Sequence, residues 1–384
     1  MRWAKKFDSR IVERKFKREL NKQGYFFTAK GAPNYLVSYE KDNLCLKTSV
    51  SKKPIQIKRN SIRKAISFMM FKRTAVRKEM DVYTNFSSAL FGILFHIFRN
   101  NSKLQKLKYG EFRLSLVGTI FFASGLERSP SIIKVLKNLG GMRVLFNYKS
   151  ILESPNALMM LEKYDLFCIV DSGAYSLFNE KKKKSKIQQQ ELFEENLMND
   201  FTIEGYAKFI NENMDNKRIL GFLPLDVVGN AYETRSNYNK LKSLVPEATV
   251  YPVWQFTDSL KELETLVQEE HELICIGGLV PFISNRKPFI RKVLDKVFTK
   301  FPEQPFHALG IGDELLLEYG FFSSDSTAYL NAQKYKKGRK IYLNNGMRVP
   351  APDKMSTEEI ISQNLRFLLG LEERKTTTQL AFDF

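Results

Sequence analysis

Three aspartates, Asp171, Asp226 and Asp325, each end a short apolar run that reads as a buried strand. A carboxylate is ionised at neutral pH without help, so it can attack an electrophilic carbon, and a second carboxylate with a raised pKa can move a proton. Asp325, at the end of the last such run, is the predicted nucleophile. Because a lone Asp after a strand is often only a helix N-cap, the prediction requires the three residues to meet at one place.

Eight short apolar runs, separated by stretches that could be helical, follow residue 114. This alternation predicts βα units around a parallel sheet, and eight is the number that closes a TIM (β/α)8 barrel. The runs are Leu116–Phe122, Met142–Tyr148, Leu166–Asp171, Ile219–Asp226, Thr249–Gln255, Leu273–Gly278, Phe306–Gly312 and Phe321–Asp325. A barrel carries its chemistry at the C-terminal ends of its strands. This rule selects Asp171, Asp226, Gln255, Gly277, Gly278 and Asp325.

The segments between and after these runs predict helices. They are Ser129–Leu139, Asn230–Leu244, Ser259–Glu270, Thr327–Tyr335 and, after the barrel, Thr357–Leu369 behind a capping signature at Ser356. We assign residues 111–345 to the barrel and residues 346–384 to a C-terminal helix and tail. The longest insertion, residues 179–218, contains a lysine run at 181–186, for which a solvated loop and a phosphate contact are the two alternatives.

The formal net charge of +19 is confined to the N-terminal part of the chain. Residues 1–110 contain 26 Lys and Arg against 7 Asp and Glu, whereas residues 111–384 contain 35 of each. Basic side chains gain affinity for a polyanion by displacing its counterions. Residues 1–110 are therefore predicted to be a basic, mainly helical, nucleic-acid-binding extension. A basic solubilising surface and affinity for an anionic membrane are the alternatives, and the aromatics Phe68, Phe71 and Tyr83 fit either interpretation.

Three cysteines, Cys45, Cys168 and Cys275, are too few and too far apart for a disulfide framework or a cysteine zinc site. We expect no metal, no other cofactor and a reducing cytoplasm. The start of the chain lacks the features of a secretory signal, and the apolar stretch 86–98 is shorter than a membrane span and is predicted to be a buried helix. Among the histidines, His96 and His307 are predicted to pack in the core and His271 to be exposed.

Several short motifs resemble those of the tRNA-guanine transglycosylase superfamily in order and approximate spacing. They are Asp171-Ser172-Gly173-Ala174-Tyr175-Ser176, Gln255, Ile276-Gly277-Gly278-Leu279, Leu309-Gly310-Ile311-Gly312 and Ser324-Asp325-Ser326. The resemblance covers about residues 115–340. It implies a TIM barrel that exchanges a guanine in a polynucleotide for a 7-deazaguanine, which is the activity of a pentosyltransferase.

The resemblance also implies roles for the matching residues. Asp325 would attack the anomeric carbon of the sugar and hold the polynucleotide as a glycosyl-aspartate, with retention at the sugar as in retaining glycosidases. Asp171 would be the acid/base, with a pKa raised by burial and a neighbouring carboxylate, although these two roles could be reversed. Asp226 would accept hydrogen bonds from the Watson–Crick edge of guanine. The remaining substrate-binding residues implied in this way are Gln255, Gly277, Gly278, Leu279, Tyr175 and Ser172.

Two departures from the family favour its DNA-modifying branch, the deazapurine transglycosylases of bacterial gene clusters and bacteriophages. The family's zinc site cannot be assembled from three scattered cysteines, and the basic extension is not a feature of the compact bacterial tRNA enzyme. We expect exchange of guanine in DNA for a base similar to preQ0, in the cytoplasm of the host if the gene is carried by a phage. The same chemistry on tRNA and a non-catalytic nucleic-acid-binding barrel are the alternatives. A protein partner or a homodimer stays open.

Overall fold

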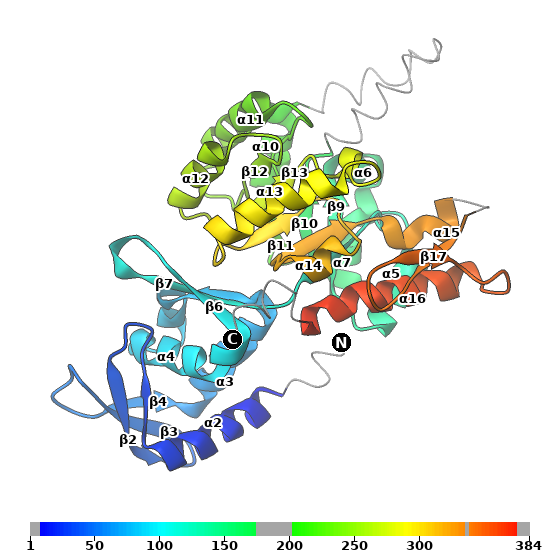
Figure 1. Cartoon of the computed structure of the whole chain (residues 1–384). Helices are drawn as coiled ribbons and strands as arrows, with labels where there is room; N and C mark the ends of the chain where they lie inside the picture. Colours follow the sequence, from blue (N-terminus) through cyan, green and yellow to red (C-terminus); the bar gives the residue numbers. More distant parts are fainter. Residues whose placement is uncertain (1–7, 174–201, 335–337, 375–384) are drawn as a thin grey trace, which may run out of the picture. The chain divides into compact units, whose positions relative to one another are not determined.

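The computed structural model describes residues 8–173, 202–334 and 338–374 and divides into two compact units, Arg2–Val117 and Gly118–Phe384 (Figure 1). Each unit has its own hydrophobic core. The division falls a few residues after position 110, because β7 (Phe112–Leu116) pairs antiparallel with β5 (Thr74–Val76) and β6 (Ser102–Lys106) of the first unit.

The second unit is built on eight parallel strands, in the sheet order β11-β10-β9-β8-β15-β14-β13-β12. Their bounds are β8 Ile120–Ser124, β9 Arg143–Asn147, β10 Phe167–Asp171, β11 Ile219–Phe222, β12 Val253–Gln255, β13 Ile274–Gly277, β14 Phe306–Ala308 and β15 Ser323–Ser326. Two backbone hydrogen bonds of 2.9 Å, from Phe222 N–H to Thr249 O and from Tyr251 N–H to Phe222 O, join the outer edges of the sheet. The predicted α/β barrel is confirmed.

Each of the eight predicted runs contains or overlaps one barrel strand. The first run differs most, because Leu116 ends β7 in the other unit and the barrel strand begins only at Ile120. Several runs are longer than their strands because the residues that follow turn toward the next helix. The run ending at Asp226, for example, leaves the sheet after Phe222.

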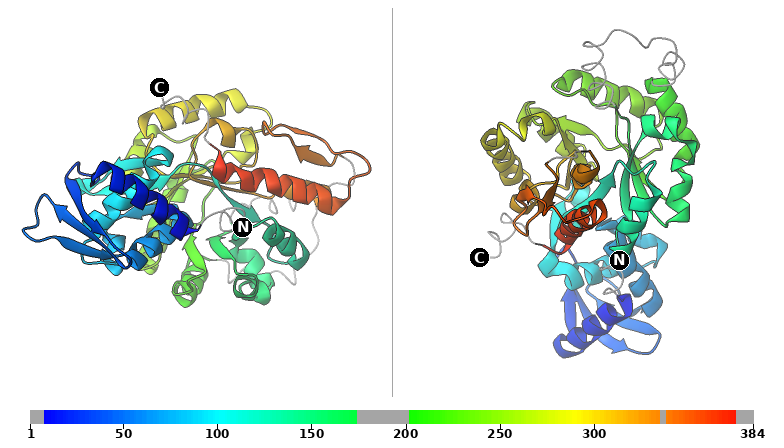
Figure 2. Two further views of the ribbon diagram at one scale, coloured as in Figure 1. Left: turned by 90° about the horizontal axis from the view of Figure 1, so that it is seen from below. Right: turned by 90° about the vertical axis from the view of Figure 1, so that its right-hand side faces the viewer.

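Helices cover the outside of the barrel (Figure 2). They are α5 Pro130–Asn138, α6 Tyr148–Glu153, α7 Met159–Lys163, α10 Ile203–Asn213, α11 Ala231–Leu244, α12 Leu260–Gln268, α13 Lys287–Lys300, α14 Leu315–Glu318 and α15 Asn331–Lys334. The predicted helices at 129–139, 230–244 and 259–270 are confirmed to within a few residues. Side-chain caps fix the starts of the last two: the Asn230 side chain accepts from the N–H of Glu233 at 3.0 Å, and the Ser259 hydroxyl accepts from the N–H of Glu262 at 3.3 Å. The predicted 327–335 helix is shorter, a 3-10 turn Ala328–Leu330 followed by α15.

The C-terminal helix is α16 (Thr357–Gly370), which follows a hairpin of β16 (Lys340–Tyr342) and β17 (Arg348–Pro350). It opens with the expected reciprocal capping box between Ser356 and Glu359. Ile361, Leu365 and Leu368 join the core of the barrel, and α16 runs beside α5 (Figure 2). The lysine run at 181–186 and the tail at 376–384 lie outside the described residues.

The first unit combines helices with two antiparallel sheets. Helices α2 (Ser9–Gln23), α3 (Arg59–Lys72) and α4 (Ser87–Phe98) meet the expectation of a helical extension, and α4 is the predicted buried helix. The sheets were not predicted. One contains β1 (Tyr25–Phe27), β2 (Pro33–Tyr39), β3 (Asn43–Thr48) and β4 (Ile55–Lys58), and the other contains β5, β7 and β6. No helix in the described ranges is long and apolar enough to cross a membrane.

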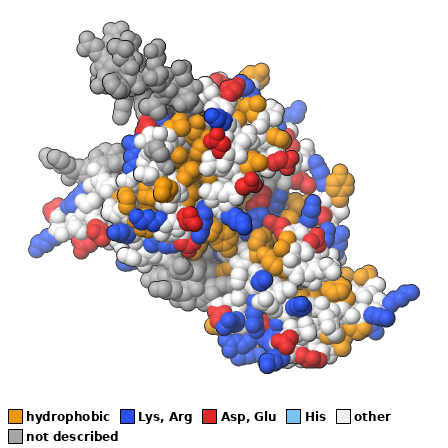
Figure 3. All heavy atoms as spheres, turned by 180° about the vertical axis from the view of Figure 1, so that it is seen from behind, with side chains coloured by type: hydrophobic (Ala, Val, Ile, Leu, Met, Phe, Trp, Pro, Cys, Tyr) orange, Lys and Arg blue, Asp and Glu red, His pale blue; other side chains and the backbone are white. Residues whose placement is uncertain are grey.

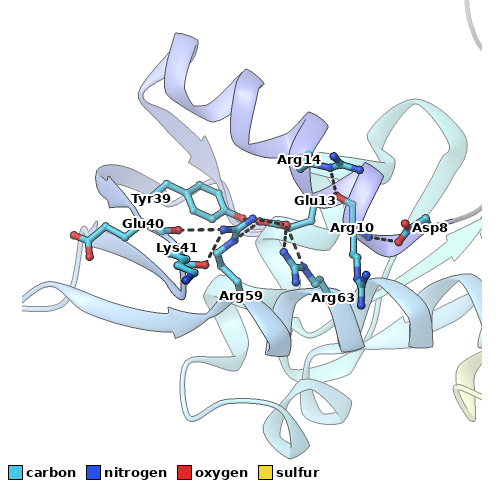
Figure 4. Close-up of polar contacts among 9 residues, drawn as sticks. All are labelled: Asp8, Arg10, Glu13, Arg14, Tyr39, Glu40, Lys41, Arg59 and Arg63. Carbon is cyan, nitrogen blue, oxygen red and sulfur yellow. Dashed lines mark hydrogen bonds and ion pairs between the residues drawn. The ribbon is translucent and has the colours of Figure 1, made fainter.

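A fully buried glutamate ties α2 to β2 and α3 (Figure 4). Glu13 accepts hydrogen bonds from the Tyr39 hydroxyl at 2.7 Å, from Arg59 at 2.8 and 3.0 Å and from Arg63 at 3.1 and 3.2 Å. Burial alone would raise the pKa of Glu13, but hydrogen bonds from Arg59, Tyr39 and Arg63 outweigh burial and hold it below its usual value. One buried carboxylate between two guanidinium groups therefore holds α2 against β2 and α3.

Candidate active site

The period-two alternation of the strands decides which side chains enter the barrel. On β10, Val170 lies in the outer core shared with the helices, whereas Ile169 lies in the inner core of the barrel. Asp171, one residue beyond Val170, therefore faces inward. The same alternation on β12 places Trp254 outside and Val253 inside.

Strand register brings the other candidates to the same mouth. Gln255 at the end of β12 pairs with Gly277 at the end of β13, so both occupy inward positions there. On β15, Asp325 pairs with Phe122 of β8, whose ring lies in the inner core. The three predicted aspartates also raise the pKa of the buried inner-core thiol of Cys275, after the larger effect of its burial. The structure thus brings the aspartates together at the C-terminal end of the barrel.

Asp325 is held from both neighbouring strands. Its Oδ2 accepts from the Ser124 hydroxyl on β8 at 2.8 Å. Its Oδ1 accepts from the Gly310 N–H, just after β14, at 2.8 Å and contacts Nε2 of His307 on β14 at 3.3 Å. The residue is only 8% exposed. A carboxylate has about four lone-pair directions, so three contacts leave Oδ2 with one free direction while the group is fixed in orientation.

His307 is a functional candidate that sequence reasoning assigned to core packing. It is fully buried, as predicted, and its ring packs edge-on against Phe122 at a centroid distance of 6.0 Å. Its Nδ1 also lies 2.8 Å from the Ser323 hydroxyl, while Nε2 faces Asp325. When the Ser323 O–H donates to Nδ1, the ring N–H is on Nε2, which then donates a hydrogen bond to the carboxylate of Asp325.

Asp171 is the carboxyl best suited to carry a proton. It is half-buried, and its Oδ2 accepts from the N–H of Gly173 at 3.1 Å. Burial, followed by the nearby charges of Asp226 and Asp325, holds the pKa of Asp171 well above its usual range. The one hydrogen of the buried Tyr206 hydroxyl is shared between the carbonyl of Val170, at 3.1 Å, and that of Leu223, at 3.0 Å, so Tyr206 links β10 to the segment after β11.

Asp226 stands on the segment that follows β11 and is half-buried. Gln255 Nε2 donates to its Oδ2 at 3.4 Å. Burial raises the pKa of Asp226 to about 6, with the charge of Asp325 adding to the rise and the Gln255 hydrogen bond opposing it. Gln255 is 1% exposed, and its Oε1 has no hydrogen-bond partner among the described residues. Through this hydrogen bond, Gln255 positions the Asp226 carboxyl.

Gly277 and Gly278 make room for this amide. A Cβ on Gly277 would lie 2.8 Å from Val253 Cγ1 and 3.1 Å from Gln255 Nε2. Gly278 has φ +78°, and its Cβ would lie 2.6 Å from Gln255 Oε1. A side chain at either position would push Gln255 out of place, so the Gly-Gly pair serves the close approach of a side chain as well as a tight turn.

The other predicted binding residues differ in how they reach the mouth. Ser172 is fully buried and donates to the carbonyl of Pro224 at 3.0 Å, which ties the ends of two neighbouring strands together. The Leu279 side chain is also fully buried, in the outer core, so its main chain is the part nearest the site. Tyr175 lies outside the described residues.

The first unit carries a shallow groove of about 610 Å³ along α3. The three aromatics predicted from the sequence, Phe68, Phe71 and Tyr83, line it together with Arg10 and Lys64. The Phe68 and Tyr83 rings are 6.1 Å apart, and none of the described lining residues is acidic. Lys and Arg side chains gather on this unit (Figure 3). Basic and aromatic side chains in one groove suit a polynucleotide strand.

Comparisons with known proteins add no assignment. No protein-family model and no curated protein matches the chain. A solved structure from Aquifex aeolicus VF5 is 11% identical, with a TM-score of 0.38 over 67% of this chain and 94% of that one. The open form of tryptophan synthase from M. tuberculosis is 7% identical, with a TM-score of 0.35 over the same shares.

Proposed function

We propose that this protein is a base-exchange transglycosylase that replaces guanine in DNA with a 7-deazaguanine through a covalent glycosyl-aspartate. The observation that carries the proposal is the position of Asp325, oriented by three contacts at the mouth of a barrel that also presents Asp171 and Asp226. The order of the short motifs along the sequence supports the same chemistry.

In the first half-reaction, Oδ2 of Asp325 attacks C1′ of the nucleotide as the bond from C1′ to N9 of guanine breaks. The bonding electron pair leaves with guanine, which takes a proton from Asp171. In the second half-reaction the incoming 7-deazaguanine gives its N9 proton to Asp171 and attacks C1′, releasing the Asp325 carboxylate. Protons and charges balance over the cycle, and two displacements retain configuration at C1′.

The electrostatics support this division of roles over the reversed one. Three donors face Asp325, which suits an anionic nucleophile, whereas the raised pKa of Asp171 suits a group that starts with a proton. Asp226 would accept hydrogen bonds from the N–H groups of guanine, with Gln255 fixing its orientation. Direct contact of Gln255, Gly277, Gly278, Leu279, Ser172 and Tyr175 with the base belongs to the same proposal.

DNA is favoured over tRNA because the chain departs from the tRNA enzymes in two ways: its three scattered cysteines cannot form their zinc site, and it carries a basic extension that the compact bacterial enzyme lacks. This extension would contact the DNA backbone without reading its sequence. The anomeric carbon is inaccessible inside a stacked duplex, so the target nucleotide must be flipped out or presented as single strand. The groove beside Phe68, Phe71 and Tyr83 would hold unpaired bases by stacking.

The test is release of labelled guanine from duplex DNA, single-stranded DNA and unmodified tRNA in parallel, with preQ0 supplied. The wild-type protein and Asp325→Ala are compared. Exchange into DNA that the variant loses would support the proposal. Exchange into tRNA alone would mean that the substrate is tRNA. Tight binding of DNA without exchange would favour a non-catalytic nucleic-acid-binding barrel.

A further inference from the structure

The four-stranded sheet β1-β2-β3-β4 of the first unit, blue in Figure 1, has one packed face and one exposed face. Its inward side chains, among them Phe26, Leu44 and Ile57, are fully buried in one core with residues of α2, α3 and α4. The three helices therefore cover the same face of the sheet. Because strand side chains alternate between the two faces, the residues next to these buried ones point away from the helices.

Three aromatic side chains lie together on this outer face. Tyr25 and Phe27 flank the buried Phe26 on β1, and Tyr25 pairs with Tyr35 of β2. The Tyr25 ring lies 5.4 Å from the Phe27 ring and 6.3 Å from the Tyr35 ring, measured between centroids. Phe27 is 47% exposed and Tyr35 is 50% exposed. A single exposed ring needs no explanation, but a cluster of exposed rings indicates a contact surface.

A lysine continues this aromatic row. Lys47 on β3 pairs with Tyr35, so Tyr25, Tyr35 and Lys47 form one row across three strands. Lys47 is exposed, as is Lys58 at the end of β4. The four strands contain no Asp or Glu. The outer face of the sheet thus combines flat apolar rings with positive charge.

The turns add positive charge at the aromatic end of the sheet. The β1–β2 turn and the β3–β4 turn lie at this end, and they carry three exposed lysines, Lys30, Lys52 and Lys53. Glu40 and Asp42, the only acidic residues between positions 25 and 58, are in the β2–β3 turn at the opposite end of the strands. The aromatic end of the sheet therefore favours a negatively charged ligand.

We propose that the outer face of this sheet binds single-stranded nucleic acid, with unpaired bases stacked on Phe27 and Tyr35 and a backbone phosphate beside Lys47. Every base has a π-face that can stack on a ring, and lysine gains affinity for the backbone by releasing counterions. An apolar protein partner would instead bury Lys47 without a counter-charge. None of the described residues that line the groove along α3 comes from these strands, so the sheet is a second contact surface of the unit. Its binding does not depend on the exchange chemistry.

The experiment measures binding of a fluorescein-labelled oligothymidylate to the full chain by anisotropy. This probe contains no guanine, so its bases do not fill the site proposed in the barrel, and failure of the exchange proposal would leave the measurement unchanged. Tyr35→Val should weaken binding about 5- to 150-fold, the range for one base stacked on one ring, while a β-branched residue keeps the strand. Lys47→Gln should reduce the slope of log K against log salt by about 0.7, the value for one phosphate of a single strand.

Val37→Thr is the matched control, because Val37 is 53% exposed on the same strand as Tyr35 and carries no ring. The substitution removes apolar surface without changing the shape of the side chain. It should leave the affinity for oligothymidylate unchanged. Equal weakening by Val37→Thr and Tyr35→Val would mean that apolar contact, and not stacking, holds the ligand, and would overturn the proposal.

Ultraviolet cross-linking of a strand that carries 5-iododeoxyuridine locates the contact. Adducts on peptides that contain Phe27 or Tyr35, together with weaker binding by Tyr35→Val, support the proposal. Adducts confined to the groove around Phe68, or an affinity that Tyr35→Val and Phe27→Val both leave unchanged, overturn it. A dimer that Tyr35→Val dissociates without a change in oligothymidylate affinity would assign the face to a second copy of the chain and also overturn it. If Tyr35→Val lowers the Tm, Phe27→Val and Lys47→Gln decide.

Discussion

The Ser124 hydroxyl donates to Oδ2 of Asp325 at 2.8 Å, across the seam where β8, the first strand of the barrel, pairs with β15, the last. The two residues are 201 positions apart in the sequence. The proposed nucleophile is therefore oriented by the closure of the barrel. Loss of the Ser124 hydroxyl would change the orientation of the Asp325 side chain and leave its carboxylate in place.

Ser124→Ala should lower kcat for base exchange roughly 10- to 150-fold, because a hydrogen bond to a charged group contributes about 1.5–3 kcal/mol. KM for the polynucleotide should change little, since Ser124 is buried. Ser326→Ala is the control, because that hydroxyl, on the same strand, accepts from the N–H of Ala328 instead. An equal loss of kcat in both variants would show that any disturbance near these strands lowers activity, and not the loss of the hydrogen bond to Asp325.

Asp226→Asn should stabilise the protein increasingly as the pH rises. The pKa of Asp226 is raised from 3.8 to about 6, so between these values the folded protein holds a proton that the unfolded chain has released. Stability then falls as pH rises through this window, and Asn removes the loss. With a discount for the half-exposed position, the gain at pH 8 is up to about 2 kcal/mol and is absent at pH 3.

Urea unfolding at pH 3, 5 and 8 measures this difference for the wild type, Asp226→Asn and the exposed control Asp215→Asn. The difference in the free energy of unfolding between Asp226→Asn and the wild type should grow as the pH rises. The difference between Asp215→Asn and the wild type should be the same at all three pH values. A gap that is the same at all three pH values would mean that burial does not raise the pKa of Asp226.

Gly278→Ala should raise KM for the incoming base about tenfold or more. Its Cβ would displace Gln255, which positions Asp226. Gly229→Ala is a matched control: its φ is +82°, close to the +78° of Gly278, but nothing lies within 4 Å of the added Cβ. Both variants should lose about 1 kcal/mol of stability from backbone strain, and only Gly278→Ala should lose base affinity. Parallel KM changes would attribute the effect to strain alone.

Arg10→Gln and Lys64→Gln should each lower the slope of log K against log salt for DNA binding by about 1. Both side chains line the groove along α3. Phe71→Leu should weaken binding of single-stranded DNA while the slope stays constant, because stacking releases no counterions. Lys208→Gln, exposed on α10, serves as the control. An unchanged slope in both groove variants would place the DNA contact elsewhere.

Much of the barrel could be predicted because most of its strands are short apolar runs, and the polar strand β15 (Ser323–Ser326) directly follows Phe321 and Phe322. The first strand was predicted to begin too early, because Leu116 and Ile120 belong to adjacent apolar segments of different units. In the first unit the abundance of Lys and Arg hid the strands, although β4, Ile55–Lys58, alternates buried and exposed residues in the period of a sheet. A search for that alternation would have found it.

Within the site, the sequence predicted which carboxylates end strands but not what holds them. The contacts of Asp325 with Ser124, His307 and Gly310 depend on the register of β15 against β8 and β14, which no local pattern specifies. His307 has the buried surroundings of a core residue, so its burial gave no functional signal. The signal that could have been used is its inward position, between the outward Phe306 and Ala308, on the strand that pairs with the strand of the predicted nucleophile.

The central claim is the covalent bond between Asp325 and the sugar, and the most direct test is intact mass spectrometry of protein denatured during reaction with a guanine-containing oligonucleotide. We predict a species with the mass of the protein plus the oligonucleotide minus guanine, mapped by peptide analysis to Asp325 and discharged by added preQ0. Its absence in Asp325→Asn would agree with this. An adduct on Asp171, or steady exchange with no adduct at all, would contradict the account.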